Sequence, residues 1–262
     1  MDIIKNIFLQ RKLIINLAKN DFKTRYAGSI FGIFWAFVQP VVTIVVYWLV
    51  FAVGFKSGQN MDVPFVLYLI SGIIPWFLLS DSISGGSSSL VSYSFLVKKV
   101  VFPVEVIPTV KLVAALIVHI FFVVFTMILC VCYGYWPSLY WIQILYYSFC
   151  TFTLALGISY FFGAITCFFR DMSQIVSIIL QVGVWTAPIM WDVNLIGVEH
   201  QWILKLNPIY YIVFGYRDAF YDENWFFEKP LLTLYYWAVT IVLFIVGSVV
   251  FKKLRPHFAD VL

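Results

Sequence analysis

Charge is scarce in this chain of 262 residues. Asp, Glu, Lys and Arg together make up 11% of it, whereas 63% of its residues are hydrophobic. A soluble domain of this length needs far more polar material to cover its surface, so the composition excludes that class. The mean hydropathy of +0.94 agrees, and we expect an integral membrane protein.

The sequence also lacks the short motifs of several enzyme classes. It has no GxxxxGK[ST] loop for nucleotide phosphates, no GxSxG nucleophile elbow and no HExxH zinc helix. His119 stands alone in an apolar run, which favours a packed histidine over a catalyst. We therefore expect no catalytic residue, no ATP site and no metal site on this chain.

Cysteine is scarce as well. Paired CxxC units and neighbouring histidines are absent around the four cysteines, which favours small packing residues over disulfide or metal roles. The first 25 residues carry six basic side chains but no clean apolar core before a small-residue cleavage site, so they do not resemble a signal peptide. We expect the amino terminus to stay in the cytoplasm.

Long apolar runs are abundant instead. A spanning helix needs about 20 apolar residues, and six runs come close to or exceed this length: 30–54, 64–90, 106–133, 141–168, 173–191 and 231–251. With both termini inside, twelve Lys and Arg residues fall in cytoplasmic segments and four in external ones, in agreement with the positive-inside rule. The sequence predicts an all-α integral membrane protein with six transmembrane helices in one domain, 1–262.

Segments outside the runs also carry helical signals. Residues 1–27 mix apolar and basic positions at helical spacing, which predicts an amphipathic helix in the cytoplasmic interface. Residues 192–230 form an external segment whose apolar core is too short to span, which predicts short re-entrant or interfacial helices between spans five and six. The basic segment between spans two and three is a candidate contact surface.

Two charged residues lie inside predicted spans. Asp81 comes late in the second span and Lys111 early in the third, at comparable distances from the loop that joins them. An unpaired charge at this depth is costly, so we predict that Asp81 and Lys111 pair. The glycine and serine cluster after Asp81, "SGGSSSL", predicts close helix packing.

The fifth run carries a polar and aromatic row. Its members follow one another at steps of three and four, so they share one side of a helix: Asp171, Gln174, Ile178, Gln181, Trp185, Pro188 and Asp192. A helix that faces only lipid has no use for such a row. Three interpretations stay open: a seam that packs against neighbouring helices, a polar path through the membrane, and a subunit contact.

Six stretches, in order and at the expected separations, carry a family resemblance. They are "RYAGSIFGIFWAFVQPVVTIVVYWLVF", "SGIIPWFLLSDSI", "LVKKVVFPVEVIP", "FRDMSQIVSIILQVGVWTAPIMW", "LNPIYYIVFGYRDAF" and "FKKLRPHFADVL". They resemble the membrane subunit of ABC-type polysaccharide exporters. The stretch "NPIYYIVFGYRDAFYDENWFFEKP" most resembles the wall teichoic acid translocation permeases of Gram-positive bacteria.

The resemblance implies a homodimer of this chain in the bacterial plasma membrane, together with two copies of a separate ATP-binding subunit that holds ATP and magnesium. It implies export of an undecaprenyl-diphosphate-linked wall teichoic acid to the outer face. Capsule polysaccharide, O-antigen, a lipid or a drug are alternative substrates. An ion channel, a proton-coupled carrier and a membrane glycosyltransferase are the other classes, with less support from the residues. Membrane lipids are expected partners, and nucleic acid is not.

The resemblance also assigns roles to residues. The first and fifth spans enclose the channel in this family, which implies substrate contacts by Phe31, Phe34, Trp35, Phe37, Gln174, Gln181 and Trp185, with Asp171 on the same side. Basic residues at the cytoplasmic mouth suit a lipid diphosphate, although ordinary positive-inside anchoring explains them equally well: Lys19, Lys23, Arg25 and Arg170. Contacts with the ATP-binding subunit are expected from Phe95, Lys98, Lys99, Phe102 and Pro103, together with the amino-terminal helix.

Overall fold

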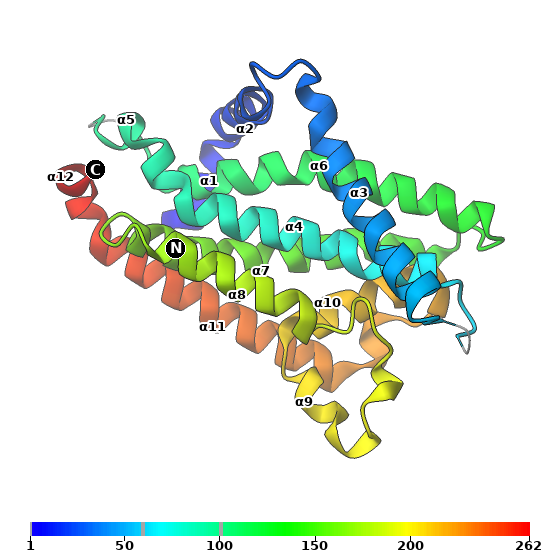
Figure 1. Cartoon of the computed structure of the whole chain (residues 1–262). Coiled ribbons are helices and arrows are strands. Elements are labelled where there is room, and N and C mark those ends of the chain that lie inside the picture. The colour runs from blue at the N-terminus through cyan, green and yellow to red at the C-terminus, as the bar shows by residue number, and fades with distance from the viewer. Residues whose placement is uncertain (1, 59–60, 100–101) are drawn as a thin grey trace.

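The computed structural model describes residues 2–58, 61–99 and 102–262, and in these residues all regular structure is helical (Figure 1). The longer helices are α2 (Arg11–Arg25), α3 (Trp35–Trp48), α4 (Phe65–Ser92), α6 (Val106–Cys132), α7 (Gln143–Thr166), α8 (Met172–Thr186) and α11 (Pro230–Leu254). The shorter ones are α1 (Asp2–Leu9), α5 (Ser94–Val97), α9 (Gln201–Lys205), α10 (Pro208–Arg217) and α12 (Phe258–Val261). The predicted all-α membrane fold is confirmed.

Five helical stretches of the described chain are long and apolar enough to cross a membrane, and each overlaps a predicted run, although Pro230–Val261 continues ten residues beyond the run 231–251. The remaining run, 173–191, contains α8, an apolar helix of 15 residues. At about 1.5 Å per residue it is shorter than a bilayer core of about 30 Å. A residue before proline avoids the helical conformation, so Ala187 becomes extended before Pro188 and the helix ends. The fifth span is therefore a short helix followed by buried residues, 187–190, in turns and bends.

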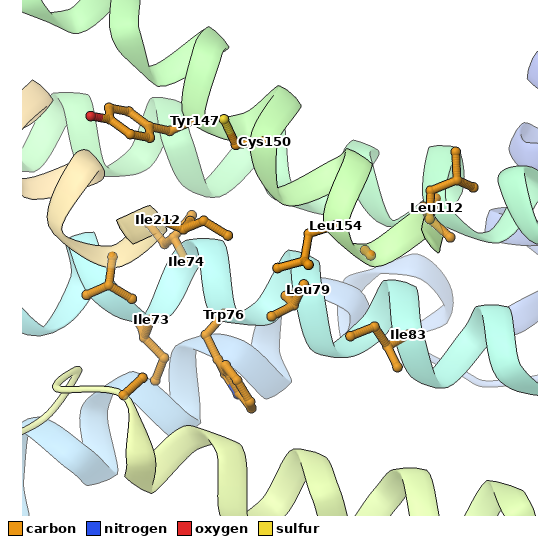
Figure 2. Close-up of a cluster of buried hydrophobic side chains, with 14 of the residues drawn as sticks. Ile73, Ile74, Trp76, Leu79, Ile83, Leu112, Tyr147, Cys150, Leu154 and Ile212 are labelled. Atoms are coloured by element: carbon orange, nitrogen blue, oxygen red, sulfur yellow. The ribbon is translucent and has the colours of Figure 1, made fainter. Parts of the chain in front are cut away.

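The central helix of the bundle is α4. It packs against α6, α7, α8 and α10, and most of its residues are buried. Figure 2 shows Ile73, Trp76 and Leu79 of α4 in one cluster with Leu154 of α7 and Ile212 of α10. Because neighbours surround it, α4 is apolar on nearly every side rather than along one stripe.

Small residues allow the closest helix contacts. A Cβ atom on Gly86 of α4 would overlap Ser159 of α7, and one on Gly247 of α11 would overlap the carbonyl oxygen of Gly157 of α7. These glycines let the backbones approach more closely than any larger residue permits. The glycine and serine cluster of α4 thus packs helices together, as predicted.

The segment between α8 and α11 contains α9 and α10. Asn207 caps α10 by accepting a hydrogen bond from the N–H of Ile209 at 3.0 Å, and Pro208 occupies the first helical position. The helix α10 contacts α4 and α7 and is largely buried, whereas no residue of α9 is buried. The predicted short helices are present, and α10 enters the bundle.

The amino-terminal segment forms α1 and α2, which meet at Gln10. The helix α2 lies across α6 (Figure 1) and is joined to it by a small apolar cluster with Ile14, Ala18 and Phe22 on the α2 side. Lys19 and Lys23 of α2 are exposed. This two-sided character agrees with the predicted amphipathic helix. At the same end of the bundle, α5 contacts α12, and we call this the α5 end.

Replacing Gly247 by alanine should destabilise the fold. The new methyl group would overlap backbone atoms of α7, which cannot turn aside as a side chain can. Overpacking of this kind costs about 1–3 kcal/mol, so we expect a lower midpoint of thermal unfolding in detergent. Gly54→Ala is the matched control, since its nearest neighbouring atom would be 4.0 Å from the added Cβ. Equal midpoints for the two variants would contradict the close α7–α11 approach.

Candidate functional site

A cavity of about 630 Å³ lies between α3, α4, α6 and α8. Its apolar lining includes Ile74 and Phe77 of α4. Its polar lining consists of Arg25, Tyr26, Gln39, Thr43, Ser80, Asp81, Ser84, His119 and Ser177. Since α4 runs toward the α5 end, the charged residues Arg25 and Asp81 lie at the part of the cavity nearer that end. A mostly apolar space with a charged margin suits an amphipathic ligand.

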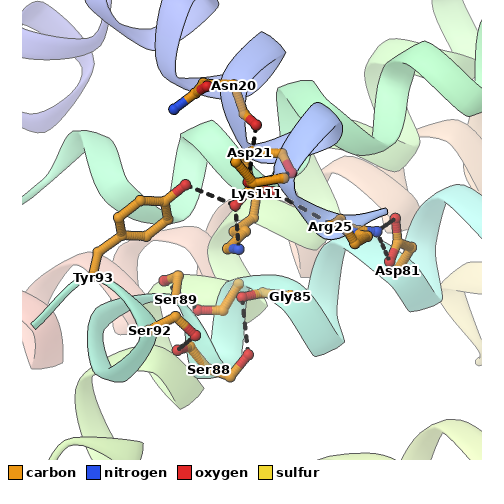
Figure 3. A network of polar contacts seen from close by, with 12 residues as sticks. Asn20, Asp21, Arg25, Asp81, Gly85, Ser88, Ser89, Ser92, Tyr93 and Lys111 are labelled. Carbon is orange, nitrogen blue, oxygen red and sulfur yellow. Dashed lines mark hydrogen bonds and ion pairs between the residues drawn. The ribbon is translucent and has the colours of Figure 1, made fainter. Parts of the chain in front are cut away.

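Arg25 joins the end of α2 to α4. Its Nη1 atom donates to both carboxylate oxygens of Asp81 at 2.9 Å, and Nη2 lies 3.7 Å from Asp21 (Figure 3). Burial, the largest single effect, lowers the pKa of Arg25, but the Asp81 and Asp21 carboxylates together with Tyr26 raise it, and the pKa is raised overall. Because both side chains are partly exposed, this pair contributes no more than about 1 kcal/mol.

Asp21 is the more deeply buried carboxylate of this network. It accepts hydrogen bonds from Lys111 Nζ at 2.5 Å and from the Tyr93 hydroxyl at 2.7 Å. Burial and the bond to Asp21 raise the pKa of Tyr93 well above its ordinary value, so the hydroxyl stays protonated and donates. Asp21 therefore fastens α2 to the ends of both α4 and α6.

The predicted Asp81–Lys111 pair is not formed in this structure, and that prediction is wrong. Asp81 pairs with Arg25, and Lys111 pairs with Asp21. The physical requirement behind the prediction holds, because each charge does have a partner. The partners come from α2, whose position over α4 and α6 cannot be read from the spans alone.

The polar row of α8 faces away from the chain's own bundle, but its last two predicted members, Pro188 and Asp192, follow the end of the helix, and Pro188 is buried. Val176 is 1% exposed, and a Cβ on Gly183 would lie 2.8 Å from the Trp76 ring of α4, so this side packs inward. At about 100° per residue, Gln174 and Gln181 lie on the opposite side, and both are exposed. Trp185 and Ile178 share that outer side, with Trp185 52% exposed. A packing seam within the chain is therefore excluded.

The aromatic residues of the first span divide into two groups. Phe31, Phe34 and Trp35 are exposed, and the rings of Phe31 and Trp35 meet edge to face with 5.8 Å between centroids. Phe37 instead turns to α6, where its ring lies 4.4 Å from that of Phe121. Of the four aromatic channel residues predicted in the first span, three are thus exposed, and Phe37 packs.

Most of the predicted basic and coupling residues are exposed. At the mouth, Lys19, Lys23 and Arg170 are exposed, as is Asp171, while Arg25 is engaged by Asp81. Between α4 and α6, the exposed residues are Phe95, Lys98 and Lys99, and the partly buried ones are Phe102 and Pro103. Residues 100–101 of that predicted contact surface lie outside the described residues. The surface is held to the carboxyl-terminal segment by an ion pair between Glu105 and Arg255.

Arg217 holds the far end of α8. Its side chain is 1% exposed, and its Nη2 atom donates to the carbonyl oxygens of Pro188 at 2.8 Å and Ile189 at 3.2 Å. The guanidinium lies 3.5 Å from the centroid of the Tyr68 ring, and the Tyr68 hydroxyl donates to the Trp191 carbonyl at 2.8 Å. The carbonyls that the helix leaves unpaired after Thr186 thus find donors on α10 and α4.

Sequence reasoning missed the roles of Asp21, Glu105 and Arg217. Arg217 was among the four basic residues expected in external segments. It ends the apolar stretch that is too short to span, and this position was the available signal. For Asp21 the signal was weaker, namely its position four residues before Arg25 on the same helix.

Comparison with known proteins decides the family. The sequence model of the ABC-2 type transporter family matches residues 12–221. The chain belongs to the ABC-2 type transporter family. It is 30% identical over 261 residues, 98% of both chains, to the O-antigen export system permease protein RfbA of Myxococcus xanthus.

Other relatives of this ABC-2 chain cover most of its length too. It is 28% identical over 254 residues to the O-antigen export system permease protein RfbA of Klebsiella pneumoniae, with 95% of both chains covered. It is 23% identical over 214 residues to the polysialic acid transport protein KpsM of Escherichia coli, which covers 80% of this chain and 82% of KpsM. The ABC-2 chain is thus a multi-helix membrane permease.

Substituting lysine for Arg217 should loosen the end of α8. Lysine keeps the charge but loses the planar group that stacks on Tyr68 and reaches two carbonyls at once. We expect a loss of about 1–3 kcal/mol of stability and faster amide exchange over residues 187–191, measured by hydrogen–deuterium exchange. Lys205→Met, which removes an exposed cation of α9, is the control. Unchanged amide exchange over residues 187–191 in Arg217→Lys would contradict the role of Arg217 in holding the end of α8.

Proposed function

We propose that this chain is the membrane subunit of an ATP-driven exporter of a lipid-linked polysaccharide. The observation that carries the proposal is the outer side of α8, where two glutamines and a tryptophan face away from the bundle of a chain that is otherwise apolar. Amide groups in lipid are costly, so this side requires either a polar path or a second protein surface. Membership of the ABC-2 type transporter family supports the polar path.

The substrate path in this proposal runs along α3 and α8. Both helices border the cavity, and both expose most of their surface in the single chain. Phe51, which follows α3, brings its ring within 6.4 Å of the Trp185 ring, so the two helices meet at the far end. Aromatic faces stack on sugar rings, while Gln174 and Gln181 offer hydrogen bonds.

A homodimer completes the path, because one chain leaves it open on one side. Two copies that face each other through α3 and α8 would enclose it. Export would run from the cytoplasmic to the outer face, with both chain termini and the α5 end cytoplasmic. Lys19, Lys23 and Arg170 would meet the lipid diphosphate there. Arg25 would do so only after it leaves Asp81.

A separate ATP-binding subunit supplies the energy in this proposal, since the sequence has no phosphate-binding loop of its own. Two copies would dock at the α5 end. The exposed Phe95, Lys98 and Lys99 are the proposed contact, and the Glu105–Arg255 pair would pass movement to α6 and α11 as rigid-body displacement.

The relatives' names bear on the choice of polymer. They name O-antigen and polysialic acid, which favours the O-antigen and capsule alternatives over the wall teichoic acid that the sequence resemblance suggested. We accordingly propose a lipid-linked polysaccharide as the substrate class and treat wall teichoic acid as one candidate within it.

Trp185→Ala should uncouple substrate from ATP hydrolysis. The measurement is the ATPase rate of the chain with its ATP-binding partner in lipid, with and without undecaprenyl-diphosphate-linked polymers of O-antigen, capsule and teichoic acid type. We expect one polymer class to stimulate the rate, and at least a tenfold weaker stimulation in Trp185→Ala, about 1.4 kcal/mol of lost stacking. Trp136→Ala, at an exposed site outside the path, is the matched control. Equal stimulation of both variants would remove Trp185 from the path, and no stimulation by any polymer would remove the proposed function.

A cysteine at Gln181 should cross-link two copies. In a chain without its four native cysteines, Gln181→Cys would face its equivalent across the proposed path, so we expect a dimer band with a bismaleimide spacer. The control is Leu145→Cys on α7, which is 75% exposed but lies on another side of the bundle. Cross-linking at Leu145 and none at Gln181 would contradict the α8-facing dimer.

A further inference from the structure

The four charges that join α2 to the bundle are placed so that they can exchange partners. Arg25 pairs with Asp81 at 2.9 Å, and Lys111 pairs with Asp21 at 2.5 Å, so both bonds cross between α2 and the bundle (Figure 3). Asp21 and Arg25 are also one turn apart on α2, and their charged groups already lie 3.7 Å from each other. A second pairing is thus available to the two charges of α2.

The other two charges are neighbours as well. Gly85 follows Asp81 by one turn of α4 and has no side chain, and the stem of Lys111 fills that space. A Cβ on Gly85 would lie 3.4 Å from Lys111 Cβ. Residues one turn apart share a helix face, so Asp81 lies on the side of α4 against which the Lys111 stem packs. A change of rotamer can then turn the long side chain of Lys111 toward Asp81 once Asp21 has moved away.

We propose that Asp21, Arg25, Asp81 and Lys111 form a two-state ion-pair switch at the charged margin of the cavity. In the closed state, Arg25–Asp81 and Asp21–Lys111 hold α2 against the bundle. In the released state, Asp21–Arg25 forms within α2 and Asp81–Lys111 forms between α4 and α6. All four charges are paired in both states, so the exchange avoids the cost of an unpaired buried charge.

The switch changes the cavity because two of its lining residues move with α2. Arg25 and Tyr26 line the cavity only while α2 is held, and its charged margin opens when they leave. The apolar contacts of Ile14 and Phe22 with α6 are also lost, but these side chains can enter the membrane interface instead, as in other amphipathic helices. The link between this opening and a transport cycle rests on the proposed function.

The exchange of ion-pair partners makes a prediction that differs from that of a simple clasp, by which we mean fixed ion pairs that only hold α2 against the bundle. Arg25→Gln and Asp81→Asn remove the same closed-state pair, so a simple clasp would release α2 equally in both. In the exchange, each variant also removes one released-state pair, but the charges left alone differ. Arg25→Gln leaves Asp81 alone in the closed state and, in the released state, leaves Asp21 alone on a helix at the membrane interface, where water reaches it. Asp81→Asn instead leaves Lys111 alone on the bundle in the released state, where a lone charge is costly. Only Arg25→Gln should therefore favour release, and adding Asp81→Asn to it should cancel the effect.

The test measures the distance between α2 and α4. Spin labels at Asn16→Cys and Ser92→Cys, both exposed positions, are placed in a full chain without its native cysteines, bound to its ATP-binding partner in phospholipid nanodiscs. Pulsed electron resonance then gives the populations of short and long distances. Lys12→Gln, which removes an exposed charge of α2, is the control, and the unfolding midpoint of each variant is measured alongside.

We expect Arg25→Gln to raise the ratio of long to short distances about fivefold, and Asp81→Asn, Lys12→Gln and the double variant Arg25→Gln with Asp81→Asn to stay within about twofold of the parent chain. Equal release by Arg25→Gln and Asp81→Asn, or no release by either, would overturn the switch. No polymer is present in this measurement. Failure of every polymer to stimulate ATP hydrolysis would therefore remove the proposed function and leave the switch standing.

Discussion

Polar groups in the bilayer core find no water, so each of them needs a partner within the protein. In this chain the requirement acts at two places along α4. At one, near its start, Arg217 and Tyr68 supply donors to carbonyls of the segment that follows α8. At the other, Asp81 and Lys111 are paired by the two charges of α2. The apolar helices between these two places need only shape complementarity.

This arrangement explains why α3 and α8 differ from the other helices. The helices α4 and α7 are buried by their neighbours, and glycines bring α7 against α11. By contrast, α8 has one buried residue and α3 has two. Their ends are held, α8 by Arg217 and the start of α3 through α2, while their length is free to meet substrate or a second copy. A rigid bundle with two lightly packed helices suits a permease whose path must widen.

Much of the architecture was predictable because it depends on local sequence. Hydropathy located all six apolar runs, and the spacing of Gln174, Gln181 and Trp185 placed them on one side of α8. The early end of α8 was missed, although Pro188 was a local signal for it. The partners of Asp81 and Lys111 were missed for a different reason, because Asp21 and Arg25 lie about 60 to 90 residues away in sequence.

The amino-acid sequence by itself determined that the chain lies in a membrane, how many apolar runs it has and which polar residues share a helix side. Composition and periodicity are local properties, and the bilayer converts them directly into spans. The tertiary structure alone decided which side of α8 faces outward, that Phe37 packs while Phe31 and Trp35 do not, and which charges pair. Those outcomes depend on how helices are rotated and docked, which is settled by the packing of many side chains at once.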